Sequence, residues 1–298
     1  MTLKEKIEAG KFIVTSELGP PQSASARVIE KKARHMQQGV DGVNITDNQT
    51  AIVRLSSIAA GRILLDQGVE PIIQMTCRDR NRIAIQSDLL GAWALGIQNV
   101  LCLTGDYMTF GNHPEARPVF DMDSVQLVGT ATSLNSGRFL SGDTMKTAPG
   151  FCIGAAANPF NEPFDFRIDR LEKKIRAGAH FIQTQPVYDV AAFSRWMEAV
   201  RQRGLHKRIA ILAGVMPVKS PKALRHMKTE VPGMVVPDGL ISRMTQAADP
   251  ETEGVAIAVE TLTALKAIKG LRGVHLMPLY WEKITPRLIE EAGLIDRA

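Results

Sequence analysis

Residues 163–185 read PFDFRIDRLEKKIRAGAHFIQTQ, and this stretch contains the repeating unit from which the fold is predicted. Its first part, 163–178, has the apolar spacing of a helix and closes on Gly178, a residue type common just past helix ends. A short apolar run, HFIQTQ (180–185), follows and is typical of a strand. The stretch therefore predicts a helix, a glycine stop and a strand in immediate succession.

The same unit recurs along the chain. Further helical patterns cover 26–39, 56–68 and 80–96. The predicted strands are eight apolar, β-rich runs: FIVTSEL (12–18), GVNITD (42–47), PIIQMTC (71–77), NVLCLTGD (99–106), FCIGAAA (151–157), HFIQTQ (180–185), RIAILAGV (208–215) and GVHLMPL (273–279). They do not alternate cleanly between polar and apolar residues, as expected for parallel strands that are covered on both faces.

Eight β/α units predict a (β/α)8 TIM barrel, with residues 1–298 forming a single domain. An open doubly wound sheet fits less well, because no G-x-G-x-x-G sequence follows any of the runs. Two stretches interrupt the rhythm: 107–122, rich in Gly, Pro and aromatic residues, and 228–250, which ends in a predicted short helix. We expect both to be loops on the catalytic face of the barrel.

The composition is that of an ordinary globular protein, with 298 residues, 45% hydrophobic and 22% charged. A net charge of +5 suits an anionic small molecule and does not by itself indicate nucleic acid, so no nucleic-acid partner is expected. The N-terminus does not resemble a signal peptide, and no apolar run approaches the ~18 residues of a membrane span. We therefore expect a cytoplasmic protein without a membrane partner.

The three cysteines, Cys77, Cys102 and Cys152, all lie in apolar runs and form no C-x-x-C pair. We interpret them as buried free thiols of a reducing compartment. The six histidines form no H-x-x-x-H pattern or Cys/His cluster, so no metal site is predicted.

Polar side chains recur at the ends of the predicted strands. They are Glu17, Thr46, Asp47, Gln74, Thr76, Thr104, Asp106, Asn158, Gln183 and Gln185. Because the carboxyl ends of barrel strands meet at one face, we expect these groups to converge on a pocket. For any one of them, a loop cap or a turn residue is the alternative interpretation.

Seven segments, in order along the whole chain, resemble the methylenetetrahydrofolate reductase family. TSELGPP resembles the family's "FEFFPP", QMTCRDRN its "HLTC" strand, and LTGD its "RGD" turn. The others are VNITDNQ, AAANPFNEP, EKKIRAGAHFIQTQPVYD and AGVMPV. The resemblance implies a flavin-containing barrel that reduces 5,10-methylenetetrahydrofolate to 5-methyltetrahydrofolate, a step of one-carbon metabolism and methionine biosynthesis.

The resemblance also implies roles for individual residues. Glu17 matches the family's catalytic acid, Asp106 its aspartate beside the flavin and the pterin, and Gln185 its folate-binding glutamine. The matches to flavin-contacting positions are Thr46, Gly105, Asn158 and Lys174.

Several positions depart from the family pattern. Gln74 and Thr104 replace a family histidine and arginine, and we assign both to the cofactor site. Asp123 and Ser124 open a predicted helix, where they would either bind a phosphate through backbone N–H groups or act as simple N-caps.

The resemblance leaves several features open. FAD is the expected cofactor, with FMN as the alternative, and electrons would come from NAD(P)H or from a partner subunit. Homo-oligomer formation is also open. Two other functions compete: a non-catalytic flavoprotein electron-transfer subunit, and a pterin-dependent methyltransferase barrel without flavin. An aldolase is disfavoured, because none of the strand runs contains the lysine that a Schiff base needs.

Overall fold

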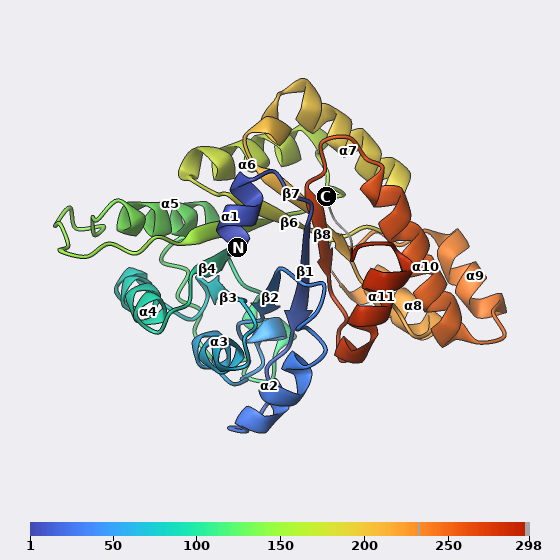
Figure 1. The fold of residues 1–298 in the computed structure, drawn as a ribbon, viewed down its shortest axis with the longest axis horizontal. Coiled ribbons are helices and arrows are strands. Elements are labelled where there is room, and N and C mark those ends of the chain that lie inside the picture. Colours follow the sequence, from blue (N-terminus) through green and yellow to red (C-terminus); the bar gives the residue numbers. More distant parts are fainter. Residues whose placement is uncertain (232, 296–298) are drawn as a thin grey trace.

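The computed structural model describes residues 1–231 and 233–295 and closes eight parallel strands into a barrel (Figure 1). The strands are β1 (Ile13–Leu18), β2 (Gly42–Ile45), β3 (Pro71–Thr76), β4 (Asn99–Leu103), β5 (Cys152–Ala157), β6 (Phe181–Pro186), β7 (Ala210–Val215) and β8 (Gly273–Leu276). Each pairs with the next, and β8 pairs with β1 with Gly273 opposite Ile13. All eight predicted runs are strands, which confirms the (β/α)8 fold.

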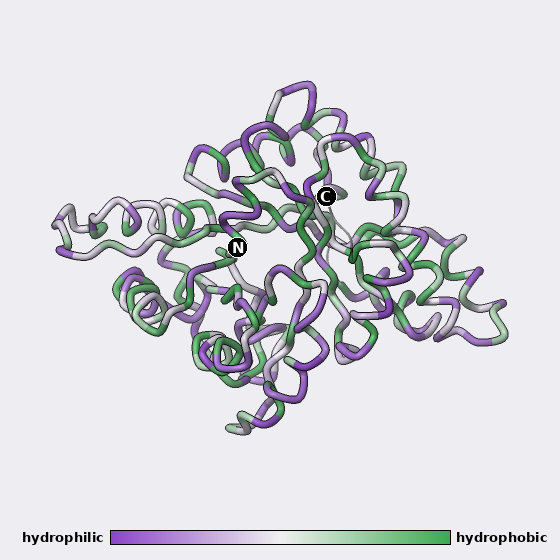
Figure 2. Tube along the Cα trace, in the orientation of Figure 1, coloured by the Kyte–Doolittle hydropathy of each residue, from purple (hydrophilic) through white to green (hydrophobic). Residues whose placement is uncertain are grey.

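Helices surround the barrel and separate it from solvent, so the hydrophobic segments gather toward the interior (Figures 1 and 2). They are α2 (Ala26–Ala33), α3 (Ser57–Asp66), α4 (Arg82–Ala94), α5 (Ser124–Asn135), α6 (Phe164–Ala177), α7 (Val190–Gln202), α8 (Pro221–Glu230), α9 (Asp238–Gln246), α10 (Pro250–Lys266) and α11 (Thr285–Glu291). A short helix, α1 (Leu3–Glu8), precedes the first strand, and single 3₁₀ turns include η1 (Gln49–Ala51), η2 (Met108–Phe110), η3 (Leu205–Lys207) and η4 (Glu282–Ile284).

One predicted helix is shorter than expected. The pattern over 26–39 predicts a helix to Gly39, whereas α2 ends at Ala33. The backbone N–H groups of His35 and Met36 bond to carbonyls only three residues back, which tightens the chain into turns. Met36 is 1% exposed, so its apolar side chain belongs to the core without needing a helix.

The inside of the barrel begins with an apolar layer at the amino ends of the strands. It consists of Leu3 from α1 and residues from the strands: Ile13, Ile72, Leu101, Cys152, Phe181, Ala210 and Leu212. A Cβ at Gly154 would lie 2.2 Å from the Phe181 ring, so only glycine leaves room for that ring. Val14 and Leu18 belong to a separate apolar cluster, which lies between the strands and the surrounding helices. They do so because successive side chains of a strand point to opposite faces.

The predicted loops and thiols also match the structure. The segments 104–123 and 216–249 follow β4 and β7 at the carboxyl ends of the strands, and α9 is the predicted short helix. All three cysteines are free and buried, and burial raises the pKa of Cys77 to about 12. Among the residues that the structure describes, we find no helix with the length and hydrophobicity needed to traverse a bilayer.

Candidate active site at the carboxyl ends of the strands

A hydrogen-bonded polar layer lies above the apolar layer inside the barrel. Gln183 Nε2 donates to Thr15 Oγ1 and to Asn44 Oδ1, both at 3.1 Å, and Asn44 Nδ2 donates back to Gln183 Oε1 at 2.5 Å. Thr15 Oγ1 lies 2.9 Å from Nδ1 of His275. All four side chains are at most 3% exposed. A buried polar group must find partners within the protein, and these residues satisfy one another.

This network sets the orientation of the His275 ring. Thr15 Oγ1 accepts from the Gln183 amide, so its own proton is available for His275 Nδ1, which is closer than the Val274 carbonyl at 3.5 Å. A neutral imidazole that accepts at Nδ1 carries its proton on Nε2. That Nε2 faces Glu17 Oε2 at 3.8 Å.

Glu17 lies near the carboxyl end of β1. Its side chain is on the same face of the strand as those of Ile13 and Thr15, which is the face toward the barrel interior. Gln74 Nε2 donates to Glu17 Oε2 at 3.2 Å, and the Glu17 side chain is 13% exposed. Within the described chain, Glu17 Oε1 makes no hydrogen bond. The carboxyl group is thus fixed through one oxygen and free at the other.

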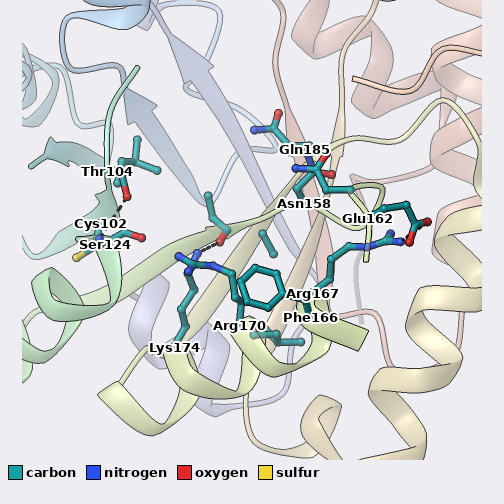
Figure 3. Close-up of a pocket in the computed structure, with 15 residues that line it drawn as sticks. Cys102, Thr104, Ser124, Asn158, Glu162, Phe166, Arg167, Arg170, Lys174 and Gln185 are labelled. Carbon is teal, nitrogen blue, oxygen red and sulfur yellow. Dashed lines mark hydrogen bonds and ion pairs between the residues drawn. The ribbon is translucent and has the colours of Figure 1, made fainter. Parts of the chain in front are cut away.

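A cavity of about 330 Å³ lies beside β4, β5 and α6 (Figure 3). It brings together five of the predicted cofactor or folate residues: Thr104, Ser124, Asn158, Lys174 and Gln185. Figure 3 shows Asn158 and Gln185 on one side, with Thr104 and Ser124 across from Lys174 and Arg170 of α6. Polar groups from five separate chain segments therefore line one space.

Lys174 is buried at the base of this cavity. It is 8% exposed, and its Nζ donates to the Ala156 carbonyl. Burial, with repulsion from Arg170, lowers the pKa of Lys174 to about 8. In the described chain Arg170 has no carboxylate within ion-pair distance; its guanidinium lies over the Phe166 ring at 5.8 Å. Two cations whose charge is not neutralised locally suit an anionic group such as a phosphate.

Asp106 lies outside this cavity, on a turn that is hydrogen-bonded to Thr50 and to Arg78. Its Oδ2 accepts from the backbone N–H of Thr50 at 2.8 Å, and its carbonyl accepts from Arg78 Nη1 at 3.4 Å. Arg78 is 1% exposed and also donates to the Asn48 carbonyl at 3.1 Å. Although burial opposes it, the Arg78 guanidinium holds the pKa of Asp79 below its usual range.

The remaining predicted residues have separate surroundings. Gly105 has a φ of +98°, and a Cβ there would lie 2.9 Å from Cβ of Arg78, so the turn before Asp106 packs directly on Arg78. Thr46 is 2% exposed, and its hydroxyl has no hydrogen-bond partner in the described chain. The Asp123 carboxylate caps α5 by accepting from the N–H groups of Val125 and Gln126, each at 2.9 Å. Asp123 is therefore the N-cap of α5.

Sequence patterns did not single out Thr15, Asn44, His275, Arg78 or Arg170. The signal that was available is a polar residue at every second position of a strand. Thr15 shares a face with Glu17, and Gln183 with Gln185, so the pattern indicates polar side chains inside the barrel. His275 is the only strongly polar residue of GVHL, and it is inside the barrel for the same reason.

The fold and this cavity define a class: a closed (β/α)8 barrel with a polar cavity at the carboxyl ends of its strands. The chain belongs to the methylenetetrahydrofolate reductase family, whose model matches residues 2–293.

Individual relatives agree with this assignment. Methylenetetrahydrofolate reductase 2 of Schizosaccharomyces pombe is 28% identical over 99% of this chain and 47% of its own length. The 5,10-methylenetetrahydrofolate reductase of Pectobacterium carotovorum is 27% identical over 76% of this chain and 71% of its own. The chain spans about half the length, or less, of the yeast and plant relatives that it matches.

A solved structure supports the fold. An uncharacterized protein from Clostridium thermocellum, described as binding two copies of 5-methyl-5,6,7,8-tetrahydrofolic acid, superposes with a TM-score of 0.68. The match covers 98% of this chain and 97% of the other at 16% sequence identity.

Proposed function

We propose that this chain is a flavin-dependent reductase that converts 5,10-methylenetetrahydrofolate into 5-methyltetrahydrofolate. The observation that carries the proposal is the setting of Glu17 at the carboxyl end of β1, with one oxygen bonded to Gln74 and facing His275. Membership of the reductase family supports it. Barrel enzymes place their reactive groups at this face.

Glu17 has the chemistry that the first step needs. The five-membered ring of the substrate must open before hydride can add, and opening requires a proton at the departing nitrogen. Glu17 Oε1, which makes no hydrogen bond in the described chain, would deliver it. Such general-acid assistance typically contributes ~10²–10⁴-fold. Gln74 and His275 would hold the other oxygen in place.

The residues around the cavity fit a flavin. Arg170 and Lys174 supply two cations, which suit the two charges of the FAD pyrophosphate, and Ser124, Thr104 and Asn158 supply polar groups. The unpartnered, buried Thr46 hydroxyl adds a further group at a strand end. When bound, the flavin would supply the hydride. FAD is the proposed cofactor and FMN the alternative.

Asp106 and Gln185 would bind the pterin. A carboxylate accepts from the N–H groups of the pterin edge, while a side-chain amide both donates and accepts. Relatives named for NADH and for NADPH both occur, so either nucleotide would serve as the electron donor, and a partner subunit is the other source.

The proposal is tested by the absorbance spectrum of the purified chain, the mass of any cofactor released on denaturation, and turnover of 5,10-methylenetetrahydrofolate with NADH and NADPH. We expect a yellow protein that releases FAD and reduces the folate. A colourless protein that still binds folate would favour a methyltransferase. A yellow protein inactive with both nucleotides would favour an electron-transfer subunit.

A further inference from the structure

The turn at residues 48–51, which follows β2, concentrates unusual backbone conformations. Within the described chain, three of the five non-glycine residues with a positive φ lie in it: Asn48 at 46°, Thr50 at 56° and Ala51 at 54°. Asparagine tolerates this left-handed region, whereas a β-branched residue such as threonine is strained there. Strain of this kind persists only where surrounding contacts fix the backbone, and it is frequent at functional sites.

The strained turn is bonded directly to Asp106. The Thr50 N–H donates to Asp106 Oδ2 at 2.8 Å, and Asp106 Oδ1 makes no hydrogen bond in the described chain. The Thr50 hydroxyl donates to the adjacent Gln49 carbonyl at 2.6 Å, so the link to Asp106 is made by the backbone alone. Like Glu17, Asp106 is held through one carboxylate oxygen and free at the other.

Asn48 and Arg78 fix the start of the turn. The Asn48 carbonyl accepts from Arg78 Nη2 at 3.1 Å, and Asn48 Oδ1 accepts from the backbone N–H of Arg54 at 3.0 Å. The same guanidinium donates through Nη1 to the Asp106 carbonyl at 3.4 Å. One buried arginine therefore bonds to the turn and to the main chain of Asp106, and it sets the separation between them.

Gly111 fixes the end of the turn from the loop that follows Asp106. A Cβ at Gly111 would lie 2.1 Å from the Ala51 carbonyl oxygen and 2.7 Å from the carbonyl carbon. The φ of Gly111 is −101°, which any residue can adopt. Glycine is therefore needed at this position because of the close approach to Ala51, and the approach leaves the turn no space to move toward the loop.

We propose that the turn 48–51 positions Asp106 to bind the pterin. This inference rests on the proposed function, in which the Asp106 carboxylate accepts from N–H groups of the pterin edge. The bond from Thr50 fixes the carboxylate plane and leaves Oδ1 for the ligand, so less freedom is lost on binding. Asn48, Thr50 and Gly111 are positioning residues, because they act through Asp106.

Two variants test the two parts of this arrangement. Thr50→Pro removes the N–H that Asp106 accepts and cannot adopt a φ of 56°. Gly111→Ala leaves every polar group in place and forces the Ala51 carbonyl away. The matched control is Gly91→Ala on α4, where an added Cβ would meet no atom within 4 Å beyond its own helix.

The measurements are the affinity of the full-length flavin-loaded protein for 5-methyltetrahydrofolate, by calorimetry, and the steady-state constants for folate reduction. Both variants should bind the folate about tenfold more weakly and show a similar rise in KM. We expect kcat to change little, since Glu17 and its contacts are untouched and a loss of uniform binding raises KM alone. Flavin content and the urea unfolding midpoint should match those of Gly91→Ala.

Each result assigns or removes a role. Wild-type folate affinity in both variants would overturn the proposal. Weaker binding in Thr50→Pro alone would overturn the role of Gly111, and weaker binding in Gly111→Ala alone would overturn that of the Thr50 N–H. If Thr50→Pro does not fold, Gly111→Ala decides the proposal. A fall in kcat, flavin content and unfolding midpoint together would show that the turn only supports the fold.

The wild-type protein separates this proposal from the proposed function. A wild type that binds no folate would overturn the proposed function, and the positioning of Asp106 for a pterin would fall with it. A wild type that binds and reduces folate, with variants that bind it equally well, would overturn the positioning role alone.

Discussion

Nε2 of His275 lies 3.8 Å from Oε2 of Glu17, while Nδ1 of the same ring lies 2.9 Å from the Thr15 hydroxyl. The ring therefore connects the candidate acid to the buried amides of Gln183 and Asn44. An acid used in each turnover must regain its proton and its position. The hydrogen bonds of Thr15 and Gln183 fix the His275 ring on the side away from Glu17. A ring fixed in this way can orient the carboxyl group without moving itself.

Replacement of His275 by Ala should lower kcat for folate reduction by about tenfold, because the ring that packs between the Glu17 carboxyl group and the Thr15 hydroxyl would no longer fix the position of that carboxyl group. Flavin content should stay at the wild-type level, because the ring faces Glu17 and Thr15. The measurement is steady-state turnover together with the flavin-to-protein ratio. Thr15→Val should give a smaller loss in the same direction, and Thr15→Ser should restore turnover. Wild-type kcat in His275→Ala would exclude a positioning role.

Glu17→Gln should abolish folate reduction and leave the protein yellow. The amide keeps the size of the side chain and its contact with Gln74, but it cannot donate a proton as a carboxylic acid does. Rapid mixing with NADH or NADPH should still bleach the flavin absorbance, since that half-reaction needs no acid at the folate nitrogen. Folate turnover within about tenfold of the wild type would contradict the assignment of Glu17 as the acid.

Arg78→Met should disturb Asp106 and weaken the fold. The guanidinium holds the carbonyls of Asp106 and Asn48 and pairs with Asp79 at 2.7 Å. The Asp79 side chain is 26% exposed, so the pair is only partly buried and its loss should cost less than the ~3–5 kcal/mol of a fully buried pair. We expect a lower free energy of unfolding in urea and weaker folate binding.

The control for Arg78 is Arg82→Met, which removes an exposed arginine paired with Asp121 at 2.9 Å. It should leave both the unfolding midpoint and folate affinity unchanged. Arg78→Lys should recover part of the stability, because an ammonium can still donate to one carbonyl. Equal effects of the Arg78 and Arg82 variants would show that burial of Arg78 does not matter.

The fold was predictable because it depends on local patterns. Apolar runs, glycine stops and their eightfold repetition are each visible within a few residues, and all eight strands were found from them. The hydrogen-bonded network of the candidate active site was not predictable, because it joins Thr15 to a residue 260 positions away. Nothing near GVHL indicates that His275 meets β1.

Charged residues were the hardest to place. Arg78 stands in CRDRN, which has the composition of an exposed turn, yet it is 1% exposed. Lys174 stands among the exposed charges of α6 and is buried because its side of the helix faces β5. Burial of these two cations follows from the packing of segments distant in sequence, which single-residue preferences do not contain.

Lys174 should make cofactor binding depend on pH. Its pKa in the free protein is lowered to about 8, so above that pH the side chain is increasingly neutral. A bound phosphate favours the charged form and raises the pKa, so binding takes up a proton. The affinity should therefore be constant well below pH 8 and should fall above it, by up to about tenfold per pH unit. Fluorescence quenching of added flavin by the apoprotein, measured between pH 6.5 and 9.5, gives the profile.

Lys174→Met should bind flavin more weakly at pH 7 and lose the decline above pH 8, whereas the exposed neighbour variant Lys173→Met should keep the wild-type profile. A decline that persists in Lys174→Met would assign the titration to another group and would leave Lys174 no part in holding the phosphate.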